Sequence, residues 1–233
     1  MTHFISIQNT YDFLELALFT DDTCIKTVQE DKKNASKRAI PLLGSLLQDH
    51  KLTLTDLSFI GVNYGPGPFT TLRVIIATVN GLSFATKLPL IGIDGLQALL
   101  AQSADANYPE TIALLNAFNK DVYFGIQLAH WTGQTRGYAN IETFLKTLSD
   151  YQPSNTLRFI GNASSLYKDE ITAALSEKQI IIDDGYPTCS VEQVGHLAYE
   201  QWQQKTDLSY KLSAHYLKTQ QYKNQYGVLT TLK

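Results

Sequence analysis

Strand-type and helix-type segments alternate along this chain in an order that limits the fold more than any other feature. Near the start, the β-branched apolar runs HFISIQ, FLELALF and CIKTVQ are separated by the turns NTYD and TDDT, which predicts an antiparallel meander of three strands. Apolar residues at helical spacing then predict a helix over residues 36–50, with Asn34 or Ser36 as N-cap and Pro41 near its first turn. Further along, FIGVNY and PLIGI are predicted strands, and residues 70–86 and 95–103 are predicted helices.

The same alternation occurs a second time after ADANYPE, a polar stretch with Pro109 that we expect to separate two lobes. ETIALLNA, VYFGIQLA, LRFIG and QIIID are predicted strands, and residues 141–148, 163–175 and 191–204 are predicted helices. We therefore expect residues 1–104 to form a first lobe, residues 105–206 a second lobe, and residues 207–233 a basic tail that returns to the first lobe. This order implies an α/β protein with a mixed sheet in each lobe.

Composition narrows the class of protein. The 233 residues include 19 basic and 22 acidic ones, and a net charge of −3 argues against a protein that wraps nucleic acid by itself. The two cysteines, Cys24 and Cys189, have no metal or redox spacing, so we expect a reduced, cytoplasmic setting. The start, MTHFISIQNT, lacks the features of a signal peptide. The longest uncharged apolar stretch, residues 74–86, is shorter than the about 20 residues that span a bilayer.

The segment GVNYGPGPFTTLR predicts a strand that enters a Gly-Pro turn and then a helix. Backbone N–H groups in such a turn can hold a phosphate, with Gly65 and Gly67 as the candidates. Glycine and proline are also common in any strand-to-helix connection, and Pro68 has no N–H to offer. The turn alone leaves both interpretations open.

The helix that follows has two unlike sides. Leu72, Ile75, Ile76, Val79 and Leu82 gather on one side, as a core face requires. The other side has a single charge and small residues at a spacing that lets another helix lie close: Thr70, Arg73, Val74, Ala77, Gly81, Phe84 and Ala85. Either this side is buried within its own chain or it docks a partner. In the preceding helix, Lys37, Ile40 and Gly44 share the non-core side.

GPGPFTTLR, followed by ATVNGLSFATKLPLIGID, resembles the GPGSFTGLR signature and helix of the bacterial TsaB (YeaZ) family. SKRAIPLL, GNAS and AHYLK resemble further family segments. The resemblance implies an actin-like ATPase (ASKHA) fold of two lobes. It also implies a non-catalytic scaffold subunit that binds and activates the catalytic paralogue TsaD, with TsaE in the full complex, for threonylcarbamoyl transfer to the tRNA adenosine 3′ of the anticodon. The helices over residues 36–50 and 70–86 are then the surface for TsaD or for a second copy of this chain, and tRNA contact is indirect.

The chain departs from the family pattern at the turn that would hold a metal–phosphate group. Gln8, Asn9 and Thr10 stand where the family has Asp-Thr-Ser, and a neutral amide does not replace that charge. Pro68 takes the place of a serine and Thr71 that of a glycine. The candidate nucleotide loop therefore comprises Gly65, Gly67, Thr70, Asn9 and Thr10, with at most weak ATP or ADP shared with the partner, and we expect no required cofactor.

The remaining motifs give weaker indications of function. His3, His50, His130, His196 and His215 show no paired ligand spacing, and no G-x-S-x-G elbow or zinc motif supports the family's old glycoprotease label, so we predict no catalytic residue and no metal site. Asp183 and Asp184 indicate a solvated turn, and Asn162 a helix N-cap. The tail beyond Asp207 has four lysines and interleaved tyrosines, which suits either RNA contact or a basic end beside an acidic body. Two alternatives remain, an actin-like small-molecule kinase or ATPase and a homodimeric regulatory protein without a tRNA role.

Overall fold

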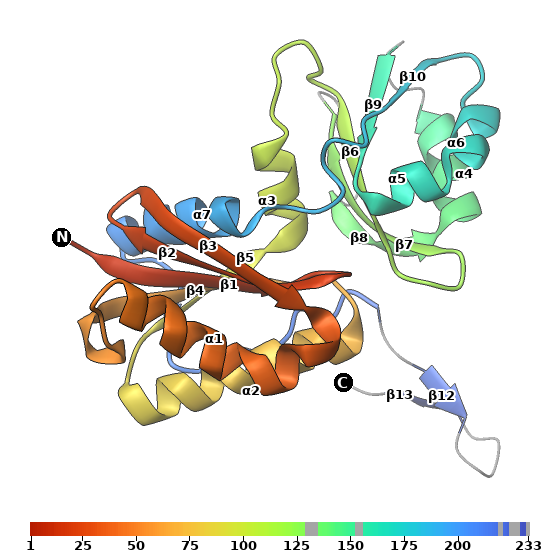
Figure 1. Cartoon of the computed structure of the whole chain (residues 1–233). Coiled ribbons are helices and arrows are strands. Elements are labelled where there is room, and N and C mark those ends of the chain that lie inside the picture. Colours follow the sequence, from red (N-terminus) through yellow and green to blue (C-terminus); the bar gives the residue numbers. More distant parts are fainter. Residues whose placement is uncertain (129–134, 152–155, 219–220, 224–228, 232–233) are drawn as a thin grey trace.

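The computed structural model describes residues 1–128, 135–151, 156–218, 221–223 and 229–231, which form two lobes and a short terminal hairpin (Figure 1). The predicted histidine His130 and much of the tail lie outside the described residues. The first lobe is built on a six-stranded sheet of order β11-β5-β4-β1-β2-β3, and the second on a five-stranded sheet of order β10-β9-β6-β7-β8.

The first sheet is mixed, as predicted. Its strands are β1 (His3–Asn9), β2 (Phe13–Thr20), β3 (Thr23–Asp31), β4 (Leu57–Gly65), β5 (Leu90–Asp94) and β11 (Leu208–Ser209). The first three strands pair antiparallel as the predicted meander, and β1, β4 and β5 pair parallel. The parallel strands bring their carboxyl ends, and the loops that follow them, to one edge of the sheet.

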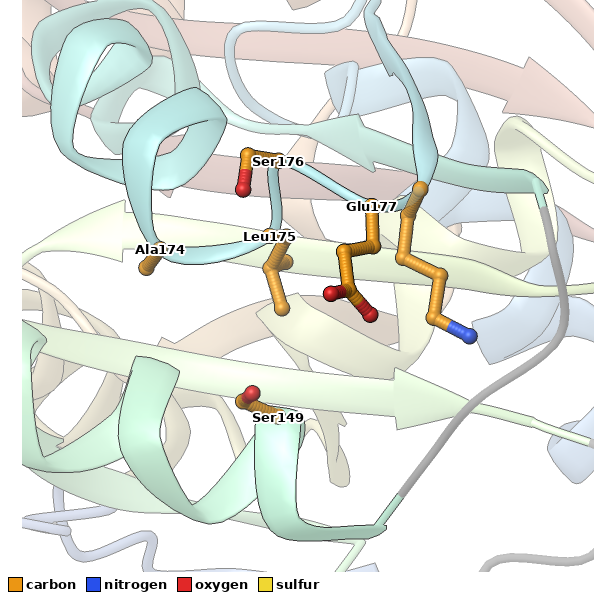
Figure 2. Close-up of a pocket in the computed structure, with 6 residues that line it drawn as sticks. Ser149, Ala174, Leu175, Ser176 and Glu177 are labelled. Carbon is orange, nitrogen blue, oxygen red and sulfur yellow. The ribbon is translucent and has the colours of Figure 1, made fainter.

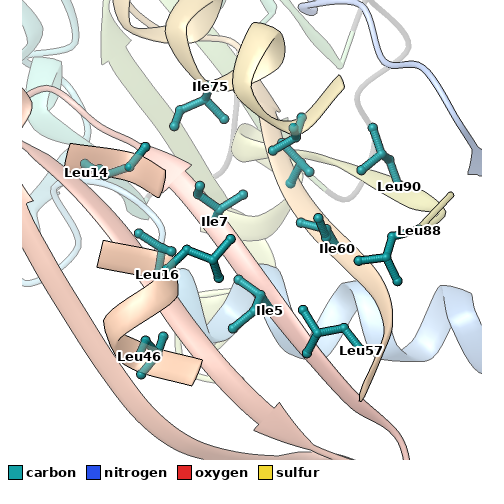
Figure 3. Packing of buried hydrophobic residues seen from close by; sticks show 14 of the residues in the cluster. Ile5, Ile7, Leu14, Leu16, Leu46, Leu57, Ile60, Ile75, Leu88 and Leu90 are labelled. Atoms are coloured by element: carbon teal, nitrogen blue, oxygen red, sulfur yellow. The ribbon is translucent and has the colours of Figure 1, made fainter. Parts of the chain in front are cut away.

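Helices cover both faces of this sheet. They are η1 (Lys32–Asn34), α1 (Ala35–Asp49), η2 (Leu54–Asp56), α2 (Phe69–Thr86), α3 (Gly95–Gln102) and α7 (Val191–Gln204). Apolar residues of α1 and α2 pack on one face (Figure 3), and those of α3 and α7 pack on the other. Pro41 lies inside α1 and not in its first turn, on the exposed side of the helix.

The second lobe repeats this plan. Its elements are β6 (Thr111–Asn116), β7 (Asp121–Gln127), β8 (Arg136–Asn140), α4 (Ile141–Tyr151), β9 (Thr156–Ile160), α5 (Asn162–Leu166), α6 (Lys168–Ala174) and β10 (Gln179–Ile182). Strands β6, β7 and β8 pair antiparallel, whereas β6, β9 and β10 pair parallel. Helices α4, α5 and α6 supply the apolar layer on one face of this sheet, and α3 packs against β6 and β7.

Two parts of the architecture differ from the expectation. Helix α7 packs on β1, β2, β4 and β5, so the predicted second lobe of residues 105–206 is wrong at its end, because α7 follows that lobe in sequence but lies on the first sheet. The helix predicted over residues 163–175 is divided at Tyr167 into α5 and α6. Beyond the lobes, β12 (Gln221–Lys223) pairs with β13 (Leu229–Thr231).

Helix α2 is the one helix in the described ranges that is long and apolar enough, by length and composition alone, to cross a membrane. A core helix of a globular lobe satisfies the same test, and Leu72, Ile75 and Val79 of α2 are indeed buried against the first sheet. Only 28% of the 18-residue helix is buried, however. Val74 and Leu82 are partly buried against the same core, and the exposed residues of the helix are Thr70, Arg73, Ala77, Gly81, Phe84 and Ala85.

Candidate functional site

The Gly-Pro turn lies at the carboxyl end of β4, in the middle of the first sheet. Gly65 ends the strand with a φ of 121°, which favours glycine. A Cβ at this position would lie 3.0 Å from the backbone oxygen of His215 and 3.1 Å from Leu72 Cδ1. Pro68 is the N-cap of α2 and makes no side-chain capping hydrogen bond. His215 and Leu72 thus pack closely against the start of the turn.

A small cavity, with about 20 Å³ of free space, lies against this turn between the two lobes. Its lining comes from both lobes and comprises Asn9, Thr10, Tyr11, Asn63, Pro66, Gly67, Pro68, Leu72, Gly95, Leu115, Thr188 and Cys189. Three of the predicted loop residues, Asn9, Thr10 and Gly67, therefore meet here. Gly65 and Thr70 are not part of the lining, and Thr70 is exposed on α2.

Asn9 is the unusual polar group of this cavity. Its side chain is buried, and both its nitrogen and its oxygen lack a hydrogen-bond partner among the described residues. Its neighbour Gln8 is fully satisfied in a structural role, because its amide nitrogen donates to Glu15 (2.9 Å) and to the backbone oxygen of Cys189 (2.9 Å), and its oxygen accepts from Asn63 (3.0 Å). A buried amide with free donors and an acceptor is expected to bind water or a ligand.

The other groups of the cavity are neutral. Burial raises the pKa of the Cys189 thiol to about 12, so the thiol is protonated and unreactive at neutral pH. Burial also raises the pKa of Tyr11, whose hydroxyl donates to the backbone oxygen of Asn116 in the second lobe (2.7 Å). Asp12, the carboxylate nearest in sequence, is 76% exposed and lies 3.9 Å from Lys32. The lining can therefore hold a small polar group by hydrogen bonds, with no carboxylate to hold a metal–phosphate group.

Sequence reasoning missed a charged junction beside the cavity. Asp94 ends β5, and its Oδ1 accepts from the backbone N–H groups of Leu96 and Gln97, which caps α3. Its Oδ2 accepts from Arg136 of the second lobe (2.9 Å) and lies 3.7 Å from His215 Nε2. The signal for this junction was the Asp-Gly pair between a strand and a helix, which is typical of an N-cap.

Two predictions on single residues are corrected. Asn162 is the first residue of α5 and not its N-cap, and its Oδ1 accepts from the backbone N–H of Asn116 (2.9 Å). Asp184 is an exposed turn residue as predicted, whereas Asp183 is half-buried. Its Oδ1 accepts from the backbone N–H of Gly185 (3.0 Å), and its Oδ2 accepts two hydrogen bonds from Arg158, a side chain that is 4% exposed. In the described ranges, no group of three or more histidine, cysteine, aspartate or glutamate side chains could hold a metal ion.

A larger cavity, of about 550 Å³, lies in the second lobe where α4 and α6 end (Figure 2). Its lining is Ser149, Ala174, Leu175, Ser176, Glu177 and Lys178. None of the predicted site residues belongs to it. The residues that line it are far in sequence from the Gly-Pro turn.

The side of α1 and α2 that faces away from the core is open, and Arg73 is the only charged residue that α2 contributes to it. Of the residues predicted to form it, Val74 is half-buried and the others are exposed: Lys37, Ile40, Gly44, Thr70, Arg73, Ala77, Gly81 and Phe84. Phe84 is 78% exposed and Ile40 51% exposed. A Cβ added to Gly44 or Gly81 would meet no atom within 4 Å. We call these nine residues the α1–α2 face.

Comparison with known proteins shows which family the chain belongs to. The family model described as "TsaD: tRNA N6-adenosine threonylcarbamoyltransferase" matches residues 27–182, about two thirds of the chain. The chain belongs to this family. Several of its curated relatives carry the name TsaB, which confirms the resemblance to the TsaB (YeaZ) family.

The TsaB relatives are distant. The "tRNA threonylcarbamoyladenosine biosynthesis protein TsaB" of Buchnera aphidicola (Schizaphis graminum) is 29% identical over 56% of this chain and 64% of the relative. The protein of the same name in Bacillus subtilis is 27% identical over 76% of this chain and 78% of the relative. The chain thus spans a little under two thirds of the length of the Buchnera protein. The solved structure of YeaZ from Pseudomonas aeruginosa superposes with a TM-score of 0.69 at 21% identity, covering 88% of this chain and 94% of that one. This likeness confirms the expected actin-like α/β fold.

Proposed function

We propose that this chain is a scaffold subunit of the machinery that makes N6-threonylcarbamoyladenosine in tRNA, and that it binds and activates a catalytic TsaD-type protein. The observation that carries the proposal is the uncovered α1–α2 face on a chain of this family. A solvated helix face is normally rich in lysine and glutamate, yet Arg73 is the only charged residue of α2. Exposed apolar side chains on a helix side with few charges are typical of a site where a partner binds.

The geometry of the face fits a helix as its counterpart. Gly44 and Gly81 lie over open space, so two backbones can approach closely where these residues meet a partner. Phe84 and Ile40 are exposed apolar side chains of the kind that anchors an interface when a partner pocket receives them. In the absence of a TsaD-type partner, we expect a second copy of the chain to use the same face.

The cavity supports a scaffold role over a catalytic one. Its lining offers the Asn9 amide, hydroxyl groups and apolar side chains, and Pro68 has no N–H for a phosphate. A phosphoryl-transfer enzyme needs groups that hold a metal ion and neutralise the transferred phosphate. We therefore expect at most weak ATP or ADP binding, a cytoplasmic site of action with TsaE in the full assembly, and contact with tRNA through the partner.

Complementation tests the proposed function. A bacterium depleted of its own TsaB would receive this chain together with the TsaD homologue of the same genome, and the nucleosides of its tRNA would be measured by mass spectrometry. Restored N6-threonylcarbamoyladenosine supports the proposal. Unchanged loss of the modification, with both proteins present at normal levels, would contradict it and favour a regulatory protein without a tRNA role.

A further inference from the structure

Residues 208–218, which we name the interlobe strap, run from the first lobe to the second and make contacts in chain order. The strap begins as β11, which pairs antiparallel with β5 at the edge of the first sheet. The backbone oxygen of Tyr210 then accepts from Ser83 of α2 (3.1 Å). The side-chain amide of Asn80 next accepts from the backbone N–H of Leu212 (2.8 Å) and donates to its oxygen (2.9 Å). These bonds fix the first half of the strap along α2.

The middle of the strap lies on the flank of the Gly-Pro turn. The backbone N–H of His215 donates to the oxygen of Tyr64 (2.8 Å), and the two rings lie 5.3 Å apart. The Tyr216 ring lies 5.1 Å from the Phe69 ring at the start of α2, and its hydroxyl accepts from Arg73 Nε (3.3 Å). The strap therefore packs against the residues at both ends of the turn.

The strap reaches the second lobe through Lys218. Its Nζ donates to the backbone oxygen of Ala117 (3.0 Å) and lies 2.7 Å from Asp121 Oδ2. Ala117 directly follows β6, and Asp121 is the first residue of β7. The side chains of Lys218 and Asp121 are 23% and 21% exposed, so this pair is shielded from solvent more than an ordinary surface ion pair.

We propose that the interlobe strap is a latch that holds the two lobes closed around the Asn9 cavity, and that release of Lys218 lets the lobes separate. In the closed arrangement the cavity has about 20 Å³ of free space, enough for about one water molecule. The unpaired amide of Asn9 lies inside it. Any ligand larger than water therefore reaches Asn9 only after the lobes part, a step that the Lys218 contacts oppose together with the Tyr11–Asn116 and Asp94–Arg136 contacts between the lobes.

Alkylation of Cys189 measures lobe opening directly, because this thiol lines the cavity and is 4% exposed. The full chain would be treated with iodoacetamide, and modification of the Cys189 peptide would be followed by mass spectrometry. Lys218→Met keeps an apolar stem but removes the ammonium group from Ala117 and Asp121. We expect the variant to be alkylated at Cys189 about tenfold faster than the wild type, as the loss of a charge-assisted hydrogen bond implies.

Lys211→Met is the matched control, since it makes the same change at an exposed side chain of the strap on the first lobe, and its rate should stay within about twofold of the wild type. Asp121→Asn should also accelerate alkylation and add little to Lys218→Met. Hydrogen exchange of the β1 and β2 amides, measured on the same samples, should be unchanged. The latch is refuted if Lys218→Met reacts as slowly as Lys211→Met, or if its acceleration comes with an equal loss of protection in β1 and β2.

Discussion

At the scale of the residue, Gly161 shows how closely local backbone and long-range packing depend on each other. It follows the last residue of β9 and is the N-cap of α5, with a φ of 93°, and a Cβ at this position would lie 2.1 Å from the backbone oxygen of Leu114 in β6. The turn from β9 into α5 thus requires glycine for two separate reasons, conformation and space. Gly44, in the middle of α1, has neither constraint.

We therefore predict opposite effects from the same substitution at these two glycines. Gly161→Ala should destabilise the chain by about 3 kcal/mol or more, since a left-handed backbone and a backbone clash both oppose it. Gly44→Ala should stabilise it by about 0.5–1 kcal/mol through helix propensity. Urea unfolding of both variants measures the two values. Equal stabilities would show that the β6–β9 contact is not as close as described.

Glu15 gives the chain a pH dependence with a definite sign. Burial raises its pKa above the ordinary value of 4.5, and Glu192 raises it further, while the hydrogen bond from Gln8 lowers it. The folded state therefore binds the proton more tightly than the unfolded state, so this contribution to stability is fully present below pH 4.5 and is lost as pH rises through the raised folded value.

Glu15→Gln tests this assignment, because glutamine keeps an acceptor for Gln8 and cannot ionise. Relative to the wild type, the variant should gain stability as pH rises from 4 to 7. Thermal unfolding at several pH values within that interval measures the difference. A wild-type minus variant difference that is independent of pH would show that Glu15 has an ordinary pKa in the folded chain.

At the scale of the element, α2 has three sides with different surroundings. Leu72, Ile75 and Val79 face the first sheet, Asn80 and Ser83 hold the interlobe strap, and the remaining side is uncovered. The sequence pattern distinguished the core side from the other residues because large aliphatic residues follow helical spacing. It did not distinguish the strap side, since Asn80 and Ser83 bind backbone groups more than 120 positions away and leave no local pattern.

Arginine substitutions at two positions of α2 test which side of the helix is buried and which is open. Ile75→Arg places a charge at a fully buried position and should unfold the chain. Gly81→Arg adds its side chain in open space and replaces glycine within a helix, so it should raise stability by up to about 1 kcal/mol. Melting temperatures of both variants test this. If Gly81→Arg melts as low as Ile75→Arg, the α2 part of the α1–α2 face is packed inside the chain and is not an open surface.

Most strands and helices could be predicted from sequence, and the exceptions have physical causes. The meander, α1, α2 and α7 follow strong periodicity, so their existence was predictable. Strand β8 (RGYAN) is a short edge strand with weak alternation and was missed. Helix α7 was assigned to the wrong lobe because the order of elements along the chain does not determine which sheet a helix packs on. Of the residues that line the cavity, Asn9, Thr10 and Gly67 were predicted from motifs, whereas Thr188 and Cys189 come from a distant loop without a local signal.

At the scale of the whole molecule, the lobes close on a space too small for a nucleotide. Together with the neutral lining, this predicts that the isolated chain binds Mg–ATP weakly and does not hydrolyse it appreciably. Calorimetry and a phosphate-release assay measure the two properties. A sub-micromolar dissociation constant, with turnover abolished by Asp12→Ala, would instead support the kinase or ATPase alternative.

The central claim is that the α1–α2 face binds a TsaD-type partner, and the affinity of the purified chain for the TsaD homologue of its own genome tests it most directly. Gly81→Arg places a long charged side chain on the α1–α2 face, where close approach of two backbones would leave it desolvated and unpaired. The account predicts that wild-type chain binds and that Gly81→Arg, still folded, binds at least about a hundredfold more weakly. Equal binding by the two folded proteins would contradict the assignment of this face.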